Sequence, residues 1–77
     1  MRDPCVYCVY RIYIARGDGL RPWPHDYYDL ETAKRVFEED HGEIRWCVVS
    51  RVEPAVERPT PVLQGEAAGS YVEWRSL

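Results

Sequence analysis

The sequence predicts an α+β fold, a small β-α-β(-β) domain in which one amphipathic helix packs on a two- to three-stranded sheet. Two segments, 5–15 and 43–53, alternate in the way that strands do. Between them, segment 29–41 repeats its apolar residues at helical spacing. The chain has 77 residues, a length that predicts a single domain over 1–77 with a thin core.

The first predicted strand, 5–15, is dense in β-branched and aromatic residues, which suit a pleated surface. Successive side chains of a strand point to opposite faces. The more apolar face carries Val6, Cys8, Tyr10, Ile12 and Ile14. We expect this face to meet the helix, which turns Tyr7, Arg11 and Tyr13 outward.

A turn and a restricted loop should follow this strand. Gly17 and Gly19 flank an aspartate and favour a turn at the strand end. Pro22 and Pro24 enclose Trp23, and two prolines exclude a helix or a central strand. Two roles stay open for Trp23: a lid over the small core, or a preorganised side chain exposed to a partner.

The predicted helix, 29–41, begins near Asp29, whose carboxylate can accept a hydrogen bond from the free N–H groups of the first turn. Its apolar stripe consists of Leu30, Ala33, Val36 and Phe37. Gly42 provides the stop, because glycine readily takes the left-handed conformation. Three adjacent carboxylates near the helix end form an acidic patch, which is either a solvated face or a dock for a basic partner. They are Glu38, Glu39 and Asp40.

The second predicted strand, 43–53, is assigned to the core through one of its two faces. That face carries Ile44, Trp46, Val48 and Val52, and the other carries Arg45, Cys47, Val49 and Arg51. Segment 54–69 holds three prolines and two glycines and predicts an irregular connection. Segment 70–75 alternates again and is a possible third strand.

Aromatic and arginine side chains gather on the predicted outward face of the sheet. The candidate partner-binding residues are Trp23, Tyr7, Arg11, Tyr13, Arg45 and Arg51. Tyrosine, tryptophan and arginine dominate the binding energy of protein interfaces, so a protein partner or a homodimer is indicated. The alternative is single-stranded nucleic acid, whose bases stack on such side chains.

The cysteines leave a further alternative, a zinc-stabilised structural module. Cys5 and Cys8 have the spacing of a ligand pair, but positions three apart on a strand point to opposite faces. A second pair is missing from the sequence, since Cys47 stands alone. We therefore assign no metal and no cofactor. No nucleophile lies beside a general base, so we assign no catalytic residue and predict a protein that is not an enzyme.

The composition narrows the functional classes further. The chain holds ten aromatic residues, and nine arginines against one lysine. A net charge of −3 argues against a general phosphate-backbone binder. No apolar run approaches the length of a membrane span, and an odd number of cysteines disfavours a secreted disulfide scaffold. We expect a cytoplasmic protein that does not bind membranes.

Three stretches occur in a defined order: Tyr10–Ile14, then Asp29–Arg35 after a tryptophan-containing loop, then Ile44–Trp46. Together they resemble small accessory proteins of bacteriophages that infect high-GC Gram-positive bacteria. The resemblance covers residues 7–53, and the excess of arginine suits a high-GC genome. It implies a protein made in the cytoplasm of an infected cell that binds and modulates a host protein. It implies no catalytic residues.

Overall fold

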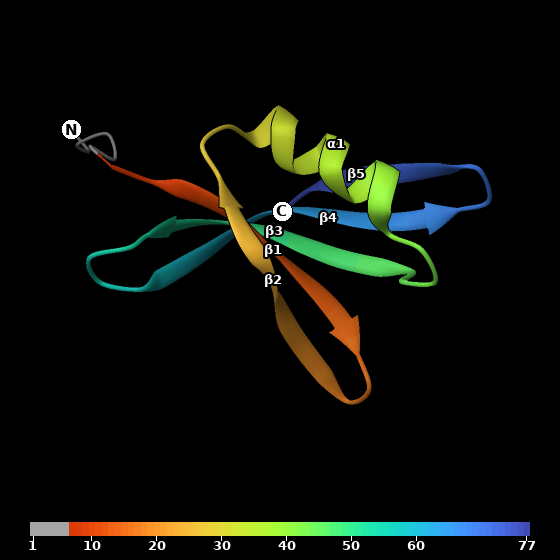
Figure 1. Cartoon of the computed structure of the whole chain (residues 1–77), viewed down its shortest axis with the longest axis horizontal. Coiled ribbons are helices and arrows are strands. Elements are labelled where there is room, and N and C mark those ends of the chain that lie inside the picture. The colour runs from red at the N-terminus through yellow and green to blue at the C-terminus, as the bar shows by residue number, and fades with distance from the viewer. Residues whose placement is uncertain (1–6) are drawn as a thin grey trace.

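The computed structural model describes residues 7–77 and has one helix on one face of a five-stranded sheet (Figure 1). In chain order the elements are β1 (Val9–Arg16), β2 (Gly19–Tyr27), α1 (Leu30–Asp40), β3 (Trp46–Glu53), β4 (Arg58–Ala68) and β5 (Tyr71–Ser76). The strands lie in the order β2-β1-β3-β4-β5, and every neighbouring pair is antiparallel. The start of the first predicted strand, Cys5 and Val6, lies outside the described residues.

The predicted β-α-β(-β) domain with a two- to three-stranded sheet is wrong, because residues 7–77 are mostly β and form five strands. β2 occupies the segment that was predicted as a loop, and β4 occupies most of the predicted irregular connection 54–69. β2 reverses the chain before the helix. For this reason β1 and β3 are antiparallel neighbours, whereas a strand-helix-strand unit would make them parallel.

Prolines explain why the two strands were missed. β2 is an edge strand, so one side of its backbone makes no ladder and Pro22 and Pro24 are tolerated. Pro59 and Pro61 lie in the first half of β4, which pairs with β3 alone because pairing with β5 begins at Leu63. This half of β4 is therefore also an edge, although β4 as a whole lies inside the sheet.

The helix matches its prediction closely. Asp29 is the N-cap, and its two carboxylate oxygens accept from the backbone N and the hydroxyl of Thr32 at 2.8 and 2.9 Å. Gly42 follows the helix end with a φ of 58°, the left-handed region that glycine adopts without strain. At 11 residues, α1 is short, and no helix in the described part of the chain is long and apolar enough to cross a membrane.

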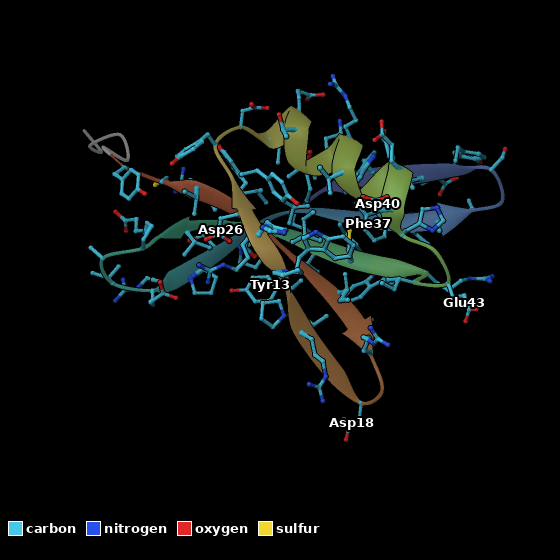
Figure 2. The ribbon with its side chains drawn as sticks, in the orientation of Figure 1. Tyr13, Asp18, Asp26, Phe37, Asp40 and Glu43 are labelled. Atoms are coloured by element: carbon cyan, nitrogen blue, oxygen red, sulfur yellow. The ribbon has the colours of Figure 1, made fainter. Side chains whose placement is uncertain are left out.

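The core lies between α1 and the sheet. Its buried members are Ile12, Ile14, Ala33, Phe37, Cys47, Val49 and Leu63. Phe37 points from the helix towards the strands (Figure 2). The ring of Trp74 meets it edge-on, with the centroids 5.9 Å apart. Aromatic rings favour this T-shaped contact, so β5 closes one side of the core through a single large side chain.

β3 faces the opposite way from the prediction. Val49 lies opposite Ile12, a core residue of β1. Directly opposed residues share a face, so Val49 and its alternate neighbour Cys47 meet the helix. Val48 and Val52, which were assigned to the core beneath the helix, face away from it. Alternation alone could not decide the phase, because both faces of β3 carry apolar residues.

Candidate functional site

The side of the sheet opposite α1, which we call the outer face, is the candidate functional surface. Strand pairing fixes its members: Arg11 lies opposite Asp26 on one side and Ser50 on the other. Tyr13 lies opposite Val48 in the same way. Within residues 7–77, neither a helix nor a second sheet covers this face (Figure 1). On this face Val9, Val48, Ser50 and Val52 are buried, whereas Leu20, Pro59 and Pro61 are exposed.

An apolar groove crosses the outer face between β2 and β4. This outer groove is lined by Tyr13, Leu20, Val48, Ser50, Pro59 and Pro61 and has a volume of about 180 Å³. Val48 and Ser50 are buried and form its floor, whereas Leu20 and both prolines are exposed. Every buried side-chain nitrogen or oxygen among the described residues has a hydrogen-bond partner. The groove therefore offers apolar surface and no unpaired polar group.

Beside the groove, Arg11 holds together what we call the Arg11 cluster, which comprises Arg11, Tyr13, Asp26 and Glu57. The Nε and Nη2 atoms of Arg11 donate to the two carboxylate oxygens of Asp26 at 2.8 and 2.9 Å. Its Nη1 atom donates to Glu57 Oε1 at 3.3 Å and to the Tyr13 hydroxyl at 3.5 Å. Bidentate pairs of this kind fix geometry as well as charge. Because Tyr13 also lines the groove, the cluster positions one side of it.

The cluster changes the ionisation of its members. The hydrogen bonds from Arg11 hold the pKa of Asp26 below its ordinary value. The hydrogen bond with Asp26 is also the main reason why the pKa of the Arg11 guanidinium is raised. The Arg11 side chain is only 18% exposed, and its donors already face two carboxylates. Arg11 is therefore committed to the protein and is poorly placed to neutralise a phosphate.

The predicted binding residues do not form one surface. Arg11 and Tyr13 share the outer face, but Arg51 lies opposite Tyr10 and so belongs to the helix side. Arg45 lies just before β3, outside the strand, and does not line the outer groove. The structure thus separates Arg51 from Tyr13 and Arg11, which were predicted to share one face with it.

The two remaining binding candidates have different surroundings. Trp23 is half-buried and packs against the core, so of its two predicted roles the lid matches the structure. Tyr7 precedes β1 and is exposed. Neither residue lines the outer groove.

The predicted acidic patch is divided. Glu38 accepts a hydrogen bond from the indole Nε1 of Trp74 at 2.7 Å, and Lys34 Nζ lies 5.8 Å from a Trp74 ring centroid. Glu38 therefore helps to hold β5 against the helix. Glu39 and Asp40 are exposed at the helix end. Only these two are left to serve as a charged surface.

The cysteines give no metal site within the described part of the chain. Cys47 is buried in the core, and burial raises the pKa of its thiol to about 12. Cys8 is disulfide-bonded, and Cys5 lies outside the described residues. Across residues 7–77, no group of three or more histidine, cysteine, aspartate or glutamate side chains is arranged to hold a metal ion.

Two larger hollows lie beside the loop that follows α1. They measure about 450 and 560 Å³ and share His41, Glu43, Ile44 and Arg45. His41 is engaged at the helix end, since its Nδ1 lies 3.1 Å from the Gly42 carbonyl oxygen and its ring lies 5.5 Å from that of Phe37. We interpret these hollows as spaces left where the chain turns from the end of α1 towards the start of β3.

Sequence reasoning missed Leu20, Pro59 and Pro61 as members of the site. It treated their segments as loops, in which side chains have no common face. One signal was present: Pro59 and Pro61 are two apart, the spacing that places residues on one face of a strand. That interpretation required β4 to have a free edge, which the sequence does not show.

No family model, curated protein or solved structure matches this chain. Its class is therefore defined by its own architecture, a helix-backed antiparallel sheet with an open face that carries an apolar groove.

Proposed function

We propose that the protein is a non-enzymatic protein-interaction module that binds an apolar side chain of a partner protein in the outer groove. The observation that carries this proposal is the groove itself. It is apolar, it lies on the uncovered face of the sheet, and it is bordered by tyrosine and proline. Rigid side chains of this kind lose little entropy when a partner binds.

The size of the groove favours a side chain over a free small molecule. Small-molecule sites enclose about 300–1,000 Å³ and bury most of the ligand. The outer groove has about 180 Å³ and lies open on the surface. A groove of this volume suits one anchoring side chain, with the rest of the partner lying across the outer face.

The resemblance of residues 7–53 to bacteriophage accessory proteins supports a more specific proposal. In it, the protein works in the cytoplasm of a high-GC Gram-positive bacterium, and the partner is a host protein that it modulates. The nucleic-acid alternative has weaker support, because Arg51 lies on the opposite side of the sheet from Tyr13 and Arg11 is already paired with two carboxylates. The zinc alternative also lacks support among the described residues.

The test compares two substitutions of the same kind. Leu20, 48% exposed, lies in the groove, and Val56, 61% exposed, lies in the turn between β3 and β4 outside the groove. A host protein retained by the immobilised wild-type chain should bind L20D at least about tenfold more weakly, because an aspartate places a charge at an apolar contact. V56D should bind as the wild type does.

Binding constants should be measured by calorimetry with the purified partner, after circular dichroism has shown that both variants are folded. Equal loss of binding in L20D and V56D, or no loss in either, would place the interface elsewhere and overturn the proposal.

A further inference from the structure

The free edge of β5 differs from the other edges of the sheet. The β2 edge contains Pro22 and Pro24, and the free half of β4 contains Pro59 and Pro61. Proline blocks edge pairing, because it has no N–H group. β5 (Tyr71–Ser76) has no proline and ends the sheet. Its outer edge is therefore a row of backbone donors and acceptors that no proline interrupts.

The direction of these backbone groups follows from one hydrogen bond. Leu77 N donates to Val62 O at 3.1 Å, so Leu77 faces β4. In an antiparallel ladder, alternate residues bond to the same neighbour. The backbone N–H and C=O groups of Tyr71, Glu73 and Arg75 consequently point towards β4. Those of Val72, Trp74 and Ser76 point away from the sheet. The free edge is thus centred on Trp74.

The side chains on either side of Trp74 carry opposite charges. Glu73 and Arg75 are exposed and share the outer face. Glu73 accepts a hydrogen bond from the Tyr71 hydroxyl at 3.3 Å. Arg75 makes no ion pair with any described residue. A strand of this pattern can complement itself if it meets a second copy in the antiparallel direction.

We propose that β5 pairs with β5 of a second copy of this chain, antiparallel and with Trp74 opposite Trp74. In this register the outward groups of Val72 meet those of Ser76 in the other copy. Glu73 then lies opposite Arg75 of the other copy, twice by symmetry. These two pairs occupy non-hydrogen-bonded positions, where opposed side chains approach most closely.

Charge selects this register over its neighbours. If the two-fold axis moves by one residue along β5, Glu73 lies opposite Glu73 of the other copy. If it moves by one residue in the other direction, Arg75 lies opposite Arg75. Like charges directly opposed across strands are destabilising. The two-fold axis is also the symmetry of most homodimers. The occupant of the edge is therefore a second copy, and this inference does not depend on the outer groove.

The mass in solution tests the pairing. Sedimentation equilibrium should give a species of about twice 9.1 kDa for the wild type. E73R and R75E should each weaken dimerisation about tenfold, because each replaces two attractive pairs with two repulsive ones. An equimolar mixture of E73R and R75E should restore a dimer, since one copy then presents two arginines and the other two glutamates. The double variant E73R/R75E should also dimerise.

Hydrogen exchange supplies an independent readout. The amides of Val72, Trp74 and Ser76 should be protected in the wild type and exchange faster in E73R, while the Leu77 amide stays protected in both. A wild type that is monomeric at every concentration overturns the proposal. A dimer that neither charge reversal weakens, or that the mixture of E73R and R75E does not restore, overturns it as well.

Discussion

At the scale of single residues, Arg11 makes two of the three ion pairs found among the described residues. Its guanidinium spans from β2 to the turn after β3, because Asp26 and Glu57 hold it from opposite sides. Glu57 has a φ of 49°, an uncommon conformation for a residue with a side chain, and its bond to Arg11 holds that turn against β1. The charge is therefore structural, although an arginine among tyrosines resembles a binding residue in sequence.

The Arg11–Asp26 pair predicts a pH-dependent loss of stability. D26N should lower the free energy of unfolding at pH 7 by about 1 kcal/mol, the upper range for partly exposed pairs, because this pair is bidentate. The folded-state pKa of Asp26 is depressed below the ordinary 3.8. The stabilisation is therefore fully present above about pH 4 and is lost as pH falls through the folded-state value. Urea unfolding from pH 7 to pH 2 measures it.

E57Q is the control for this prediction. Glu57 is 64% exposed in its side chain and makes one long bond, so E57Q should cost less than D26N at pH 7. The unfolding curves of D26N and wild type should converge at pH 2. A difference that stays constant down to pH 2 would mean that the pair adds no charge-dependent stability.

At the scale of elements, the contact between β4 and β5 depends on one glycine. Gly65 lies opposite Trp74, and the indole ring lies across the position that a Cβ would occupy. A Cβ built on Gly65 would be 2.6 Å from a ring carbon of Trp74. The absence of a side chain lets the ring cross β4 to reach Phe37 and Glu38. The glycine thus allows β5 to contribute to the core.

G65A should therefore destabilise the fold by about 1–3 kcal/mol, because the ring must leave a close-packed position. G19A is the matched control: Gly19 also lies in a strand, and nothing lies within 4 Å of the position that a Cβ would take there. It should change stability by less than about 0.5 kcal/mol. Thermal unfolding compares the two, and equal midpoints for G65A and G19A would contradict the packing argument.

Local chemistry made the helix and the first strand predictable. Asp29 caps α1 and Gly42 follows its end, and both signals act within a few residues of the chain. β2 and β4 each pair with the strand directly before them, but whether their prolines are tolerated depends on where the edges of the whole sheet lie. A proline in β2 is acceptable only because β2 is an edge, and the prolines in β4 only because pairing with β5 begins after them, at Leu63. The sequence shows where the prolines are, but it does not show which strands lie at an edge of the sheet.

The candidate site was predictable only in part for the same reason. Tyr13 and Arg11 follow from the alternation of β1, which was assigned to the correct face. Arg51 of β3 was placed on the wrong face, because Cys47 and Val48 are both apolar and either could face the helix. The groove itself needs four strands side by side, β2, β1, β3 and β4, and two of them were predicted as loops.

At the scale of the whole molecule, the two proposed interfaces are compatible. The outer groove lies between β2 and β4, while the proposed dimer uses the free edge of β5. An antiparallel pairing of two edges around a two-fold axis continues the sheet and leaves both outer faces on the same side. A dimer would then present two grooves to a partner, which raises avidity without any new contact.

Cys47 can report on the stability of the whole assembly. Its side chain is fully buried, and burial raises the pKa of its thiol to about 12, against an ordinary value of 9.0. The thiolate is the reactive form, so a folded chain should resist alkylation and react only when it unfolds. The labelling rate should therefore rise with pH towards about 9 and then level, because the unfolded thiol has the ordinary pKa.

Dimerisation makes this labelling depend on protein concentration. A dimer stabilises the folded state by mass action, and the free monomer grows only as the square root of the total concentration. Above the dissociation constant, a hundredfold increase in wild-type protein should slow Cys47 labelling about tenfold, whereas E73R should show the same slowing only at about tenfold higher concentrations. Peptide-resolved mass spectrometry after iodoacetamide treatment distinguishes Cys47 from the other cysteines.

Rapid labelling that keeps rising towards pH 12 would show that the thiol reacts in the folded chain. A wild-type rate independent of concentration would show that β5 pairing adds nothing to stability.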